Sequence, residues 1–158
     1  MKISERGKKL IERLEGSELV MYLDAGGLPT IGVGHLLSKS ELMSGKLRIL
    51  GKVVRWHEGL TEQQCLDLLD QDLDLAELAV TAHVRATLAQ HQFDALVSWV
   101  FNVGVGSLRD STLLKLLNAG RYDQVPAQLR RWNKCASKVK KGLVNRREAE
   151  IAMWEGRS

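Results

Sequence analysis

Two carboxylates, Glu15 and Asp24, are the residues of this sequence whose types and spacing could do chemistry. Glu15 ends an amphipathic stretch, and Asp24 starts a glycine-rich turn that leads into the β-prone residues 30–33. Carboxylates on two elements that face one gap can share acid–base work, because a protonated one donates to a leaving oxygen while an ionised one activates water. Cleavage of a glycosidic bond needs such a pair. We therefore take Glu15 as a candidate general acid and Asp24 as a candidate general base.

Thr30 is the third candidate, because it follows the turn and falls on the strand opposite Asp24. A hydroxyl both donates and accepts hydrogen bonds, so Thr30 and Asp24 could hold one water molecule between them. Each residue also has an ordinary explanation when taken alone. An aspartate before glycine is a common turn residue, a threonine is a common strand residue, and most surface glutamates have no catalytic role.

Local patterns predict the elements that must position these side chains. Apolar residues at helical spacing predict a helix that stops at Gly16, after which the period changes to that of a β-hairpin. From Thr61, which opens a predicted capping box, the pattern is helical to the end. The expected fold class is α+β and mainly α, in a single domain. It comprises a lobe with a short antiparallel sheet at residues 1–60, a connecting helix at 61–80 and a helical lobe at 81–158.

Two segments are harder to assign. Residues 41–59 contain β-prone runs at 47–50 and 53–56, which could add a third strand to the sheet. A helix is expected at about 122–133, with Pro126 interrupting it.

Size and cysteine content exclude several kinds of site. At 158 residues the chain can bury a core without a disulfide or a metal. Cys65 and Cys135 are far apart and are expected to be free thiols, so neither zinc ligation nor a catalytic thiol has support. The glycines between residues 26 and 34 match no nucleotide-binding pattern. No metal and no organic cofactor are therefore expected.

Charge and hydropathy bear on partners and location. No apolar stretch approaches the ~20 residues that span a bilayer, and the charged N-terminal residues do not form a secretory signal, so we expect the chain to be held in the cytoplasm. The net charge of +4 suits an anionic partner, such as a bacterial wall polymer or a nucleic acid. The positive charge is concentrated late in the sequence, at Arg130, Arg131, Lys134, Lys138, Lys140, Lys141, Arg146 and Arg147.

Several motifs together resemble one family. They are Glu15-Gly16, Tyr22-Leu23-Asp24, Pro29-Thr30-Ile31-Gly32-Val33-Gly34-His35, Phe101-Asn102-Val103-Gly104, Ser111-Thr112-Leu113-Leu114, and the end from Gly142 through Arg146-Arg147 to Glu150. This pattern resembles the phage-type lysozymes, the endolysins that cleave the β-1,4 bond between N-acetylmuramic acid and N-acetylglucosamine. The resemblance covers nearly the whole chain.

The resemblance implies a role for each site residue. Glu15 would be the general acid, Asp24 the base and Thr30 the partner that holds the water, with Arg146 close to Glu15. Inversion of configuration is implied, which needs carboxyl groups about 6.5–9.5 Å apart. His35 would form an ion pair that ties the two lobes, with Asp72 as its partner. The candidate sugar contacts are Leu36, Phe101, Thr112 and Gln128. The four tryptophans, Trp56, Trp99, Trp132 and Trp154, are expected in the core rather than under sugars.

The resemblance also implies partners and a place of action. The substrate would be peptidoglycan, and the protein would be a monomer that binds no nucleic acid. It would stay in the host cytoplasm until the membrane is permeabilised, and then act on the wall in the periplasm during phage release. That route implies dependence on a separate membrane protein of the holin kind.

Three other readings stay open from the sequence. A lytic transglycosylase would form 1,6-anhydro products without water, but the presence of both Asp24 and Thr30 favours hydrolysis. A basic nucleic-acid-binding protein is motivated by the late basic residues, although no recognised binding motif accompanies them. A catalytically inactive wall-binding module is disfavoured because the acid, base and hydroxyl are all present.

Overall fold

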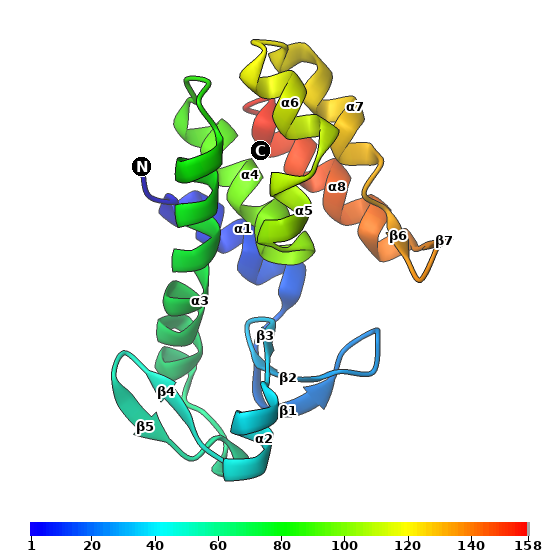
Figure 1. Ribbon diagram of the computed structural model, residues 1–158. Helices are drawn as coiled ribbons and strands as arrows, with labels where there is room; N and C mark the ends of the chain where they lie inside the picture. The colour runs from blue at the N-terminus through cyan, green and yellow to red at the C-terminus, as the bar shows by residue number, and fades with distance from the viewer. Residues whose placement is uncertain (158) are drawn as a thin grey trace. The chain divides into compact units, whose positions relative to one another are not determined.

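The protein is mainly helical, as expected, with small antiparallel sheets (Figure 1). The computed structural model describes residues 1–157. Its α-helices are α1 (Glu5–Glu15), α2 (Lys39–Ser44), α3 (Glu62–His83), α4 (Gln90–Val103), α5 (Val105–Arg109), α6 (Thr112–Asn118), α7 (Val125–Arg130) and α8 (Lys141–Trp154). Its strands are β1 (Glu18–Leu23), β2 (Pro29–Gly32), β3 (His35–Leu36), β4 (Leu47–Ile49), β5 (Lys52–Val54), β6 (Lys134–Cys135) and β7 (Lys138–Val139). Short 3₁₀ turns, η1 (Trp56–Glu58) and η2 (Tyr122–Gln124), precede α3 and α7.

The chain divides into two compact units. Residues Ile11–Asp74 form the N-terminal unit, and Met1–Leu10 join the chain from Leu75 onward in the C-terminal unit. The expected N-terminal lobe, residues 1–60, therefore differs from the N-terminal unit at both ends, because α3 is divided between the two units after Asp74 and the first ten residues belong to the other unit. At the start of the chain, the backbone N–H of Ile3 donates to Glu77 Oε2 at 2.7 Å and that of Ser4 donates to Asp94 Oδ1 at 3.0 Å, which ties these residues to the C-terminal unit. Within residues 1–157, no helix is both long and apolar enough to cross a membrane.

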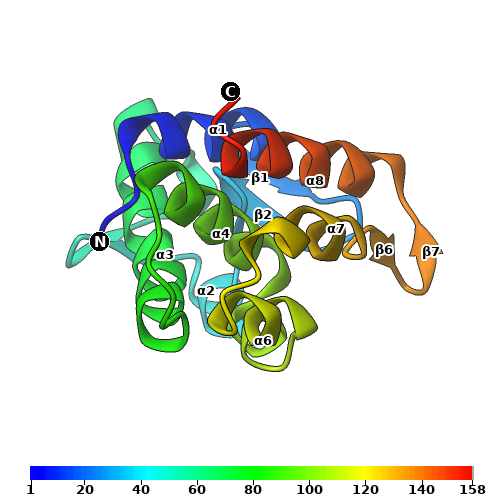
Figure 2. The same cartoon turned by 90° about the horizontal axis from the view of Figure 1, so that it is seen from above.

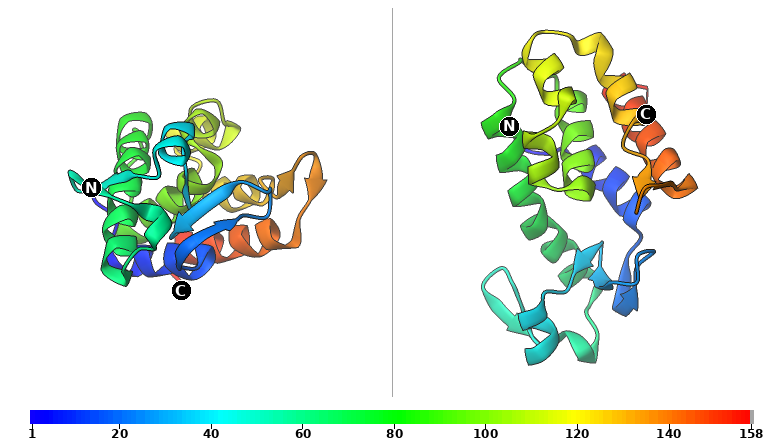
Figure 3. Two further views of the ribbon diagram at one scale, coloured as in Figure 1. Left: turned by 90° about the horizontal axis from the view of Figure 1, so that it is seen from below. Right: turned by 45° about the vertical axis from the view of Figure 1, so that its right-hand side comes forward.

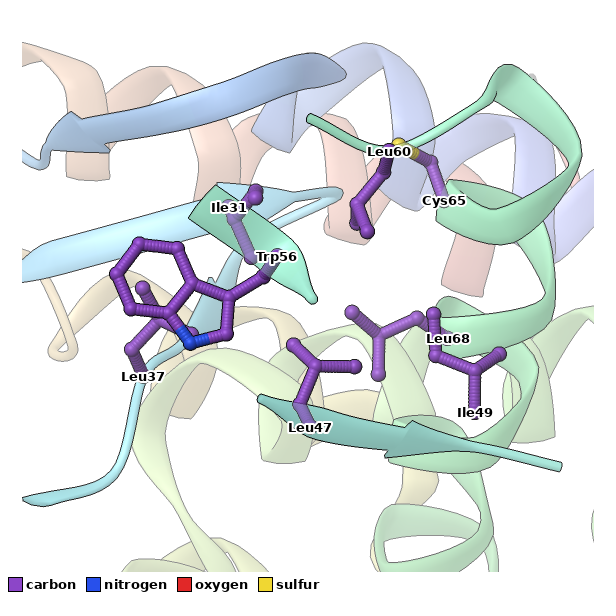
Figure 4. Packing of buried hydrophobic residues seen from close by; sticks show 8 residues of the cluster. All are labelled: Ile31, Leu37, Leu47, Ile49, Trp56, Leu60, Cys65 and Leu68. Carbon is purple, nitrogen blue, oxygen red and sulfur yellow. The ribbon is translucent and has the colours of Figure 1, made fainter. Parts of the chain in front are cut away.

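The N-terminal unit is built on a three-stranded sheet with the order β1-β2-β3. Its core combines Ile31 and Leu37 with side chains from the segments that follow the sheet, and Figure 4 shows how they pack together. The remaining members of this cluster are Leu47, Ile49, Trp56, Leu60, Cys65 and Leu68. The unit thus has an apolar core of its own beneath one face of the sheet.

The ambiguous residues 41–59 form a separate hairpin rather than a strand of the first sheet. Strands β4 and β5 pair only with each other in the described chain, with Leu47 opposite Val54. Leu47 and Ile49 are buried and Arg48 between them is exposed, so the hairpin contributes alternate side chains to the core. The helix that follows begins at the predicted capping box, where Gln64 N donates to Thr61 Oγ1 at 3.0 Å and Thr61 N donates to Gln64 Oε1 at 2.9 Å.

The C-terminal unit is a helical bundle in which α4 packs against α8, and α7 packs against both α6 and α8 (Figure 2). Pro126 does not interrupt a helix, because it lies at the first turn of α7, where its missing N–H costs nothing. Before α8 the chain forms the β6–β7 hairpin, which extends away from the bundle (Figure 3). No hairpin was expected there, because residues 134–139 lack the Asn-Gly type of turn signal.

Three tryptophans confirm the expectation of core positions, and one departs from it. Trp56, Trp99 and Trp154 are buried. Trp132 is only half-buried, with one edge packed against Trp99 at a ring-centroid distance of 5.5 Å. It therefore remains available to line a pocket.

His35 fixes the sheet to α3. Its Nδ1 lies 2.7 Å from Asp72 Oδ2 and its Nε2 lies 3.0 Å from Glu41 Oε1. The expected contact with Asp72 is confirmed, but both residues belong to the N-terminal unit, so the pair joins two elements of one unit rather than two lobes. Burial disfavours the imidazolium, yet the hydrogen bonds and charges of Asp72 and Glu41 outweigh burial and raise the pKa of His35 to about 9.

This raised pKa predicts that stability falls with rising pH. The folded pKa of about 9 exceeds the ordinary value of 6.5, so the stabilisation is complete below pH 6.5 and disappears as the pH passes 9. Its upper limit is about 3 kcal/mol, at 1.36 kcal/mol for each pKa unit. Urea unfolding at pH 6 and pH 9.5 measures it. The variant His35→Gln should lose most of the difference between the two pH values, and an equal difference in both proteins would contradict the assignment.

Candidate active site

The candidate acid lies where α1 ends. Gly16 has a φ of 73° and its N–H donates to Glu12 O at 2.8 Å, which terminates the helix directly after Glu15. The Glu15 side chain is half-buried and lies against Gly34. A Cβ placed on Gly34 would fall 2.5 Å from Glu15 Oε2, closer than any real contact allows. The absence of a side chain at Gly34 is therefore what makes room for the Glu15 carboxylate.

The candidate base, Asp24, forms the turn between β1 and β2. Its Oδ1 accepts hydrogen bonds from Gly26 N at 2.9 Å and Leu28 N at 2.8 Å. Its backbone N–H donates to Leu28 O at 2.9 Å. Oδ2 accepts no hydrogen bond from any of residues 1–157. One carboxylate oxygen thus holds the turn in shape, and the other can accept a further hydrogen bond.

Thr30 is buried, with 2% of its surface exposed, and its hydroxyl donates to Leu28 O at 2.9 Å. The hydroxyl proton is therefore already used in this hydrogen bond, but the hydroxyl oxygen can still accept another one. Thr30 and Asp24 share Leu28 as a backbone partner but are not bonded directly to each other in the described structure. This arrangement suits a bridging water better than a direct contact.

The strand register places three side chains in one row. Tyr22 of β1 and Leu36 of β3 both lie directly opposite Thr30. Residues directly opposite in antiparallel strands project to the same face of the sheet. Leu36 is 53% exposed, so an apolar surface continues the row beyond Thr30. Ile31 and His35 form the neighbouring pair and project to the other face, toward the core and α3.

Tyr22 is the residue that the sequence reasoning did not assign to the site. Burial raises the pKa of its phenol, and the negative charges of Glu15, Glu18 and Asp24 raise it further. The phenol therefore lies within the electrostatic field of both candidate catalytic carboxylates, which links them to one locality. Its place in the Tyr22-Leu23-Asp24 motif was the available signal.

Two expected sugar contacts of the C-terminal unit share a pocket. Thr112, directly after the N-cap Ser111 of α6, and Gln128 of α7 line a pocket of about 280 Å³ together with Trp132. Phe101 is half-buried on α4 and does not line this pocket. Its neighbour Asn102 lines a second pocket, of about 320 Å³, which also includes Trp132.

Arg146 is buried in the C-terminal unit. Its Nε donates to Glu150 Oε2 at 3.2 Å and its Nη2 donates to Ser98 O at 3.1 Å. Since Glu15 belongs to the N-terminal unit, the approach of Arg146 to Glu15 stays a prediction. No group of His, Cys, Asp or Glu side chains among residues 1–157 is arranged to hold a metal ion.

Comparison with known proteins identifies the family of the chain. Residues 12–150 match the family described as phage lysozyme. The endolysin of Salmonella phage P22 is 36% identical over 154 residues, which is 98% of each protein. The endolysin of Bacillus phage PZA is 37% identical over 156 residues, but the chain spans only 55% of that relative's length. The solved endolysin of Escherichia coli O157:H7 phage FAHEc1 has a TM-score of 0.81 at 34% identity, over 98% of this chain and 93% of that one. The chain therefore belongs to the phage lysozyme family of glycoside hydrolases.

Proposed function

We propose that this protein is an endolysin that hydrolyses the β-1,4 bond between N-acetylmuramic acid and N-acetylglucosamine in bacterial peptidoglycan. One observation carries the proposal: Glu15, Asp24 and Thr30 come from a helix end, a turn and a strand of one compact unit. The charges of both carboxylates reach the same phenol, that of Tyr22. Family membership supports a lysozyme reaction at this place.

The proposed step is a single displacement with inversion. Glu15 gives its proton to the glycosidic oxygen as the bond from that oxygen to the anomeric carbon breaks. A water molecule, donating one hydrogen bond to Asp24 Oδ2 and one to Thr30 Oγ1, attacks the opposite face of that carbon and loses a proton to Asp24. The two N–H groups on Asp24 Oδ1 hold the base in position throughout.

Sugar binding is proposed for Leu36, Phe101, Thr112 and Gln128. The exposed side chain of Leu36 extends the Tyr22–Thr30 row with an apolar surface, which suits the hydrophobic face of a pyranose ring. The hydroxyl of Thr112 and the amide of Gln128 meet in one pocket, where they can bond sugar hydroxyl groups.

Digestion of purified sacculi tests the reaction and its residues. The wild type should release fragments with a free reducing end and the mass of added water. Glu15→Gln should abolish turnover, and Asp24→Asn should lower the rate roughly 10²–10⁴-fold, because each removes one half of the acid–base pair. The readouts are turbidity clearance and mass spectrometry of the muropeptides.

The matched control is Glu12→Gln, which alters a glutamate on the same helix that forms no part of the proposed site. It should keep full activity. Products lighter by one water would indicate a transglycosylase instead, and normal clearance by Glu15→Gln would reject the proposed acid.

Gly34→Ala tests whether the space beside Glu15 matters. The added methyl group would meet Glu15 Oε2 at 2.5 Å and Glu15 Cδ at 2.9 Å, so the carboxylate must move. We expect a loss of activity of about 10²-fold, the cost of a misplacement near 1 Å. Clearance of sacculi and urea unfolding are measured on the same preparation.

Gly51→Ala is the control for backbone strain, since Gly51 also has a positive φ, 83°, but meets nothing within 4 Å. It should lose stability as Gly34→Ala does and keep its activity. Equal activity in the two variants would show that the contact with Glu15 is unimportant.

We also infer that the enzyme serves host lysis and depends on a holin-type membrane protein to reach the wall. Expression of the chain alone in a Gram-negative host should leave cells intact, and chloroform should then cause prompt lysis because it breaches the membrane. The Glu15→Gln variant should not lyse after chloroform. Lysis without any membrane treatment would contradict the dependence.

A further inference from the structure

The β6–β7 hairpin and the first residue of α8 present an exposed cationic surface. Lys134 pairs with Val139, Cys135 pairs with Lys138, and the hairpin extends from the C-terminal unit (Figure 3). Two lysines of the hairpin and the two that follow it are exposed, and none of the four forms an ion pair with another residue of the described chain. They are Lys134, Lys138, Lys140 and Lys141, called here the hairpin lysines.

The charge of this surface is not balanced locally. The sequence contains no aspartate or glutamate from residue 124 to residue 147. The acidic residue that follows, Glu148, is engaged by Arg130 at 2.7 Å. Uncompensated positive charge on a projecting hairpin repels itself and attracts an anionic partner.

The backbone of the hairpin is also strained. Ala136 and Ser137, the two residues of its turn, have φ values of 52° and 65°. This is the turn that a two-residue hairpin favours, but it is normally made by Asn and Gly. Strain of this kind persists where the surroundings or a function maintain it.

The hairpin adjoins the proposed sugar contacts of the same unit. Lys134 and Cys135 line the pocket of about 320 Å³ together with Trp132. Trp132 also lines the pocket that holds Thr112 and Gln128. A ligand bound at Thr112 and Gln128 is thus separated from the hairpin by one shared side chain.

Arg147 and Asn102 line the pocket beside the hairpin, and hydrogen bonds hold their polar side chains in place. Arg147 is buried, and its Nη2 donates to Asn102 Oδ1 at 2.8 Å while its Nη1 donates to the Trp132 carbonyl at 3.1 Å. Its Nε lies 2.7 Å from Glu150 Oε1. These bonds hold Asn102 and Trp132 in place, so the pocket is a formed feature of the unit.

We propose that the hairpin lysines bind the carboxylates of the peptide stems that branch from the glycan strand. The proposal rests on the proposed function, because it assumes that peptidoglycan is the substrate. Peptidoglycan combines neutral sugars with short acidic peptides. This matches a pocket that offers Thr112, Gln128 and one charged side chain of each sign, Asp110 and Arg131, followed by a cationic hairpin. A stem of four residues spans at most about 14 Å, so only a surface close to the sugar pocket can be reached.

Two other anionic partners fit less well. Single-stranded nucleic acid is bound by cationic grooves that carry several aromatic stacking platforms. Residues 134–141 include no aromatic side chain, and the nearby Trp132 is half-buried against Trp99. An anionic membrane would be held by charge together with a broad apolar face. The hairpin offers one exposed large apolar side chain, that of Val139.

Sedimentation with purified sacculi measures this binding without requiring turnover. All proteins carry Glu15→Gln so that the sacculi stay intact. One variant changes the four hairpin lysines to Gln together. The matched control changes four exposed lysines elsewhere, Lys9, Lys39, Lys46 and Lys52, to Gln, and so removes the same charge.

The hairpin variant should bind native sacculi about tenfold more weakly than its parent, because each exposed ion pair contributes a factor of less than about five. The control variant should bind as the parent does. Amidation of the sacculus carboxyl groups should weaken the parent to the level of the hairpin variant and leave that variant unchanged.

Equal binding of parent and hairpin variant to native sacculi would overturn the proposal. So would an unchanged affinity of the parent for amidated sacculi, or a preference of the parent for DNA or anionic vesicles at the same salt concentration. Hydrolysis of sacculi by the wild type is scored separately. Carboxylate-dependent binding without any hydrolysis would reject the proposed function and keep the assignment of the hairpin.

Discussion

The reversal between β1 and β2 is the constraint on which the candidate site depends. Asp24 donates its backbone N–H to Leu28 O at 2.9 Å and accepts from Gly26 N and Leu28 N on one carboxylate oxygen. The turn sets the register of the hairpin, and the register sets Thr30 opposite Tyr22 and Leu36. The residue proposed as the base is therefore also the residue that shapes the turn. A substitution of Asp24 would change both the turn and the proposed acid–base pair.

The two faces of this small sheet make different contacts. On one face, Ile31 is fully buried and His35 is held by two carboxylates, which fastens the sheet to α3 and to the core. The other face carries Thr30 and the exposed Leu36. Because side chains alternate along a strand, anchoring one set fixes the orientation of the other set, which includes the proposed site residue Thr30. This attachment is what would allow a short hairpin to hold the proposed catalytic groups in place.

Basic residues of the C-terminal unit divide into two kinds that the sequence does not distinguish. Arg146 and Arg147 are buried and surround Glu150, which has no exposed surface. Such a cluster is costly to desolvate, and removing one of its members would leave a buried charge without its partner. Lys138 and Lys140 remain in solvent on the hairpin before α8. The basic residues that contribute to the net charge of +4 thus include both a buried ion-pair cluster around Glu150 and an exposed surface on the hairpin.

Local features were predictable because a few neighbouring residues encode them. The end of α1 at Gly16, the turn at Asp24 and the cap at Thr61 each follow from helix-stop, turn or capping chemistry within about five residues. The candidate catalytic residues could be named for the same reason, since their motif is short and continuous.

Features that depend on residues far apart in the chain were decided only by the tertiary structure. Three features are of this kind: the separate β4–β5 hairpin, the place of Ile3 and Ser4 in the C-terminal unit, and the half-exposed position of Trp132. The sequence by itself determined which groups could do the chemistry and which local elements carry them. Only the fold decided that Gly34 leaves space for Glu15 and that Trp132 separates two pockets, because steric exclusion and burial depend on where the rest of the chain lies.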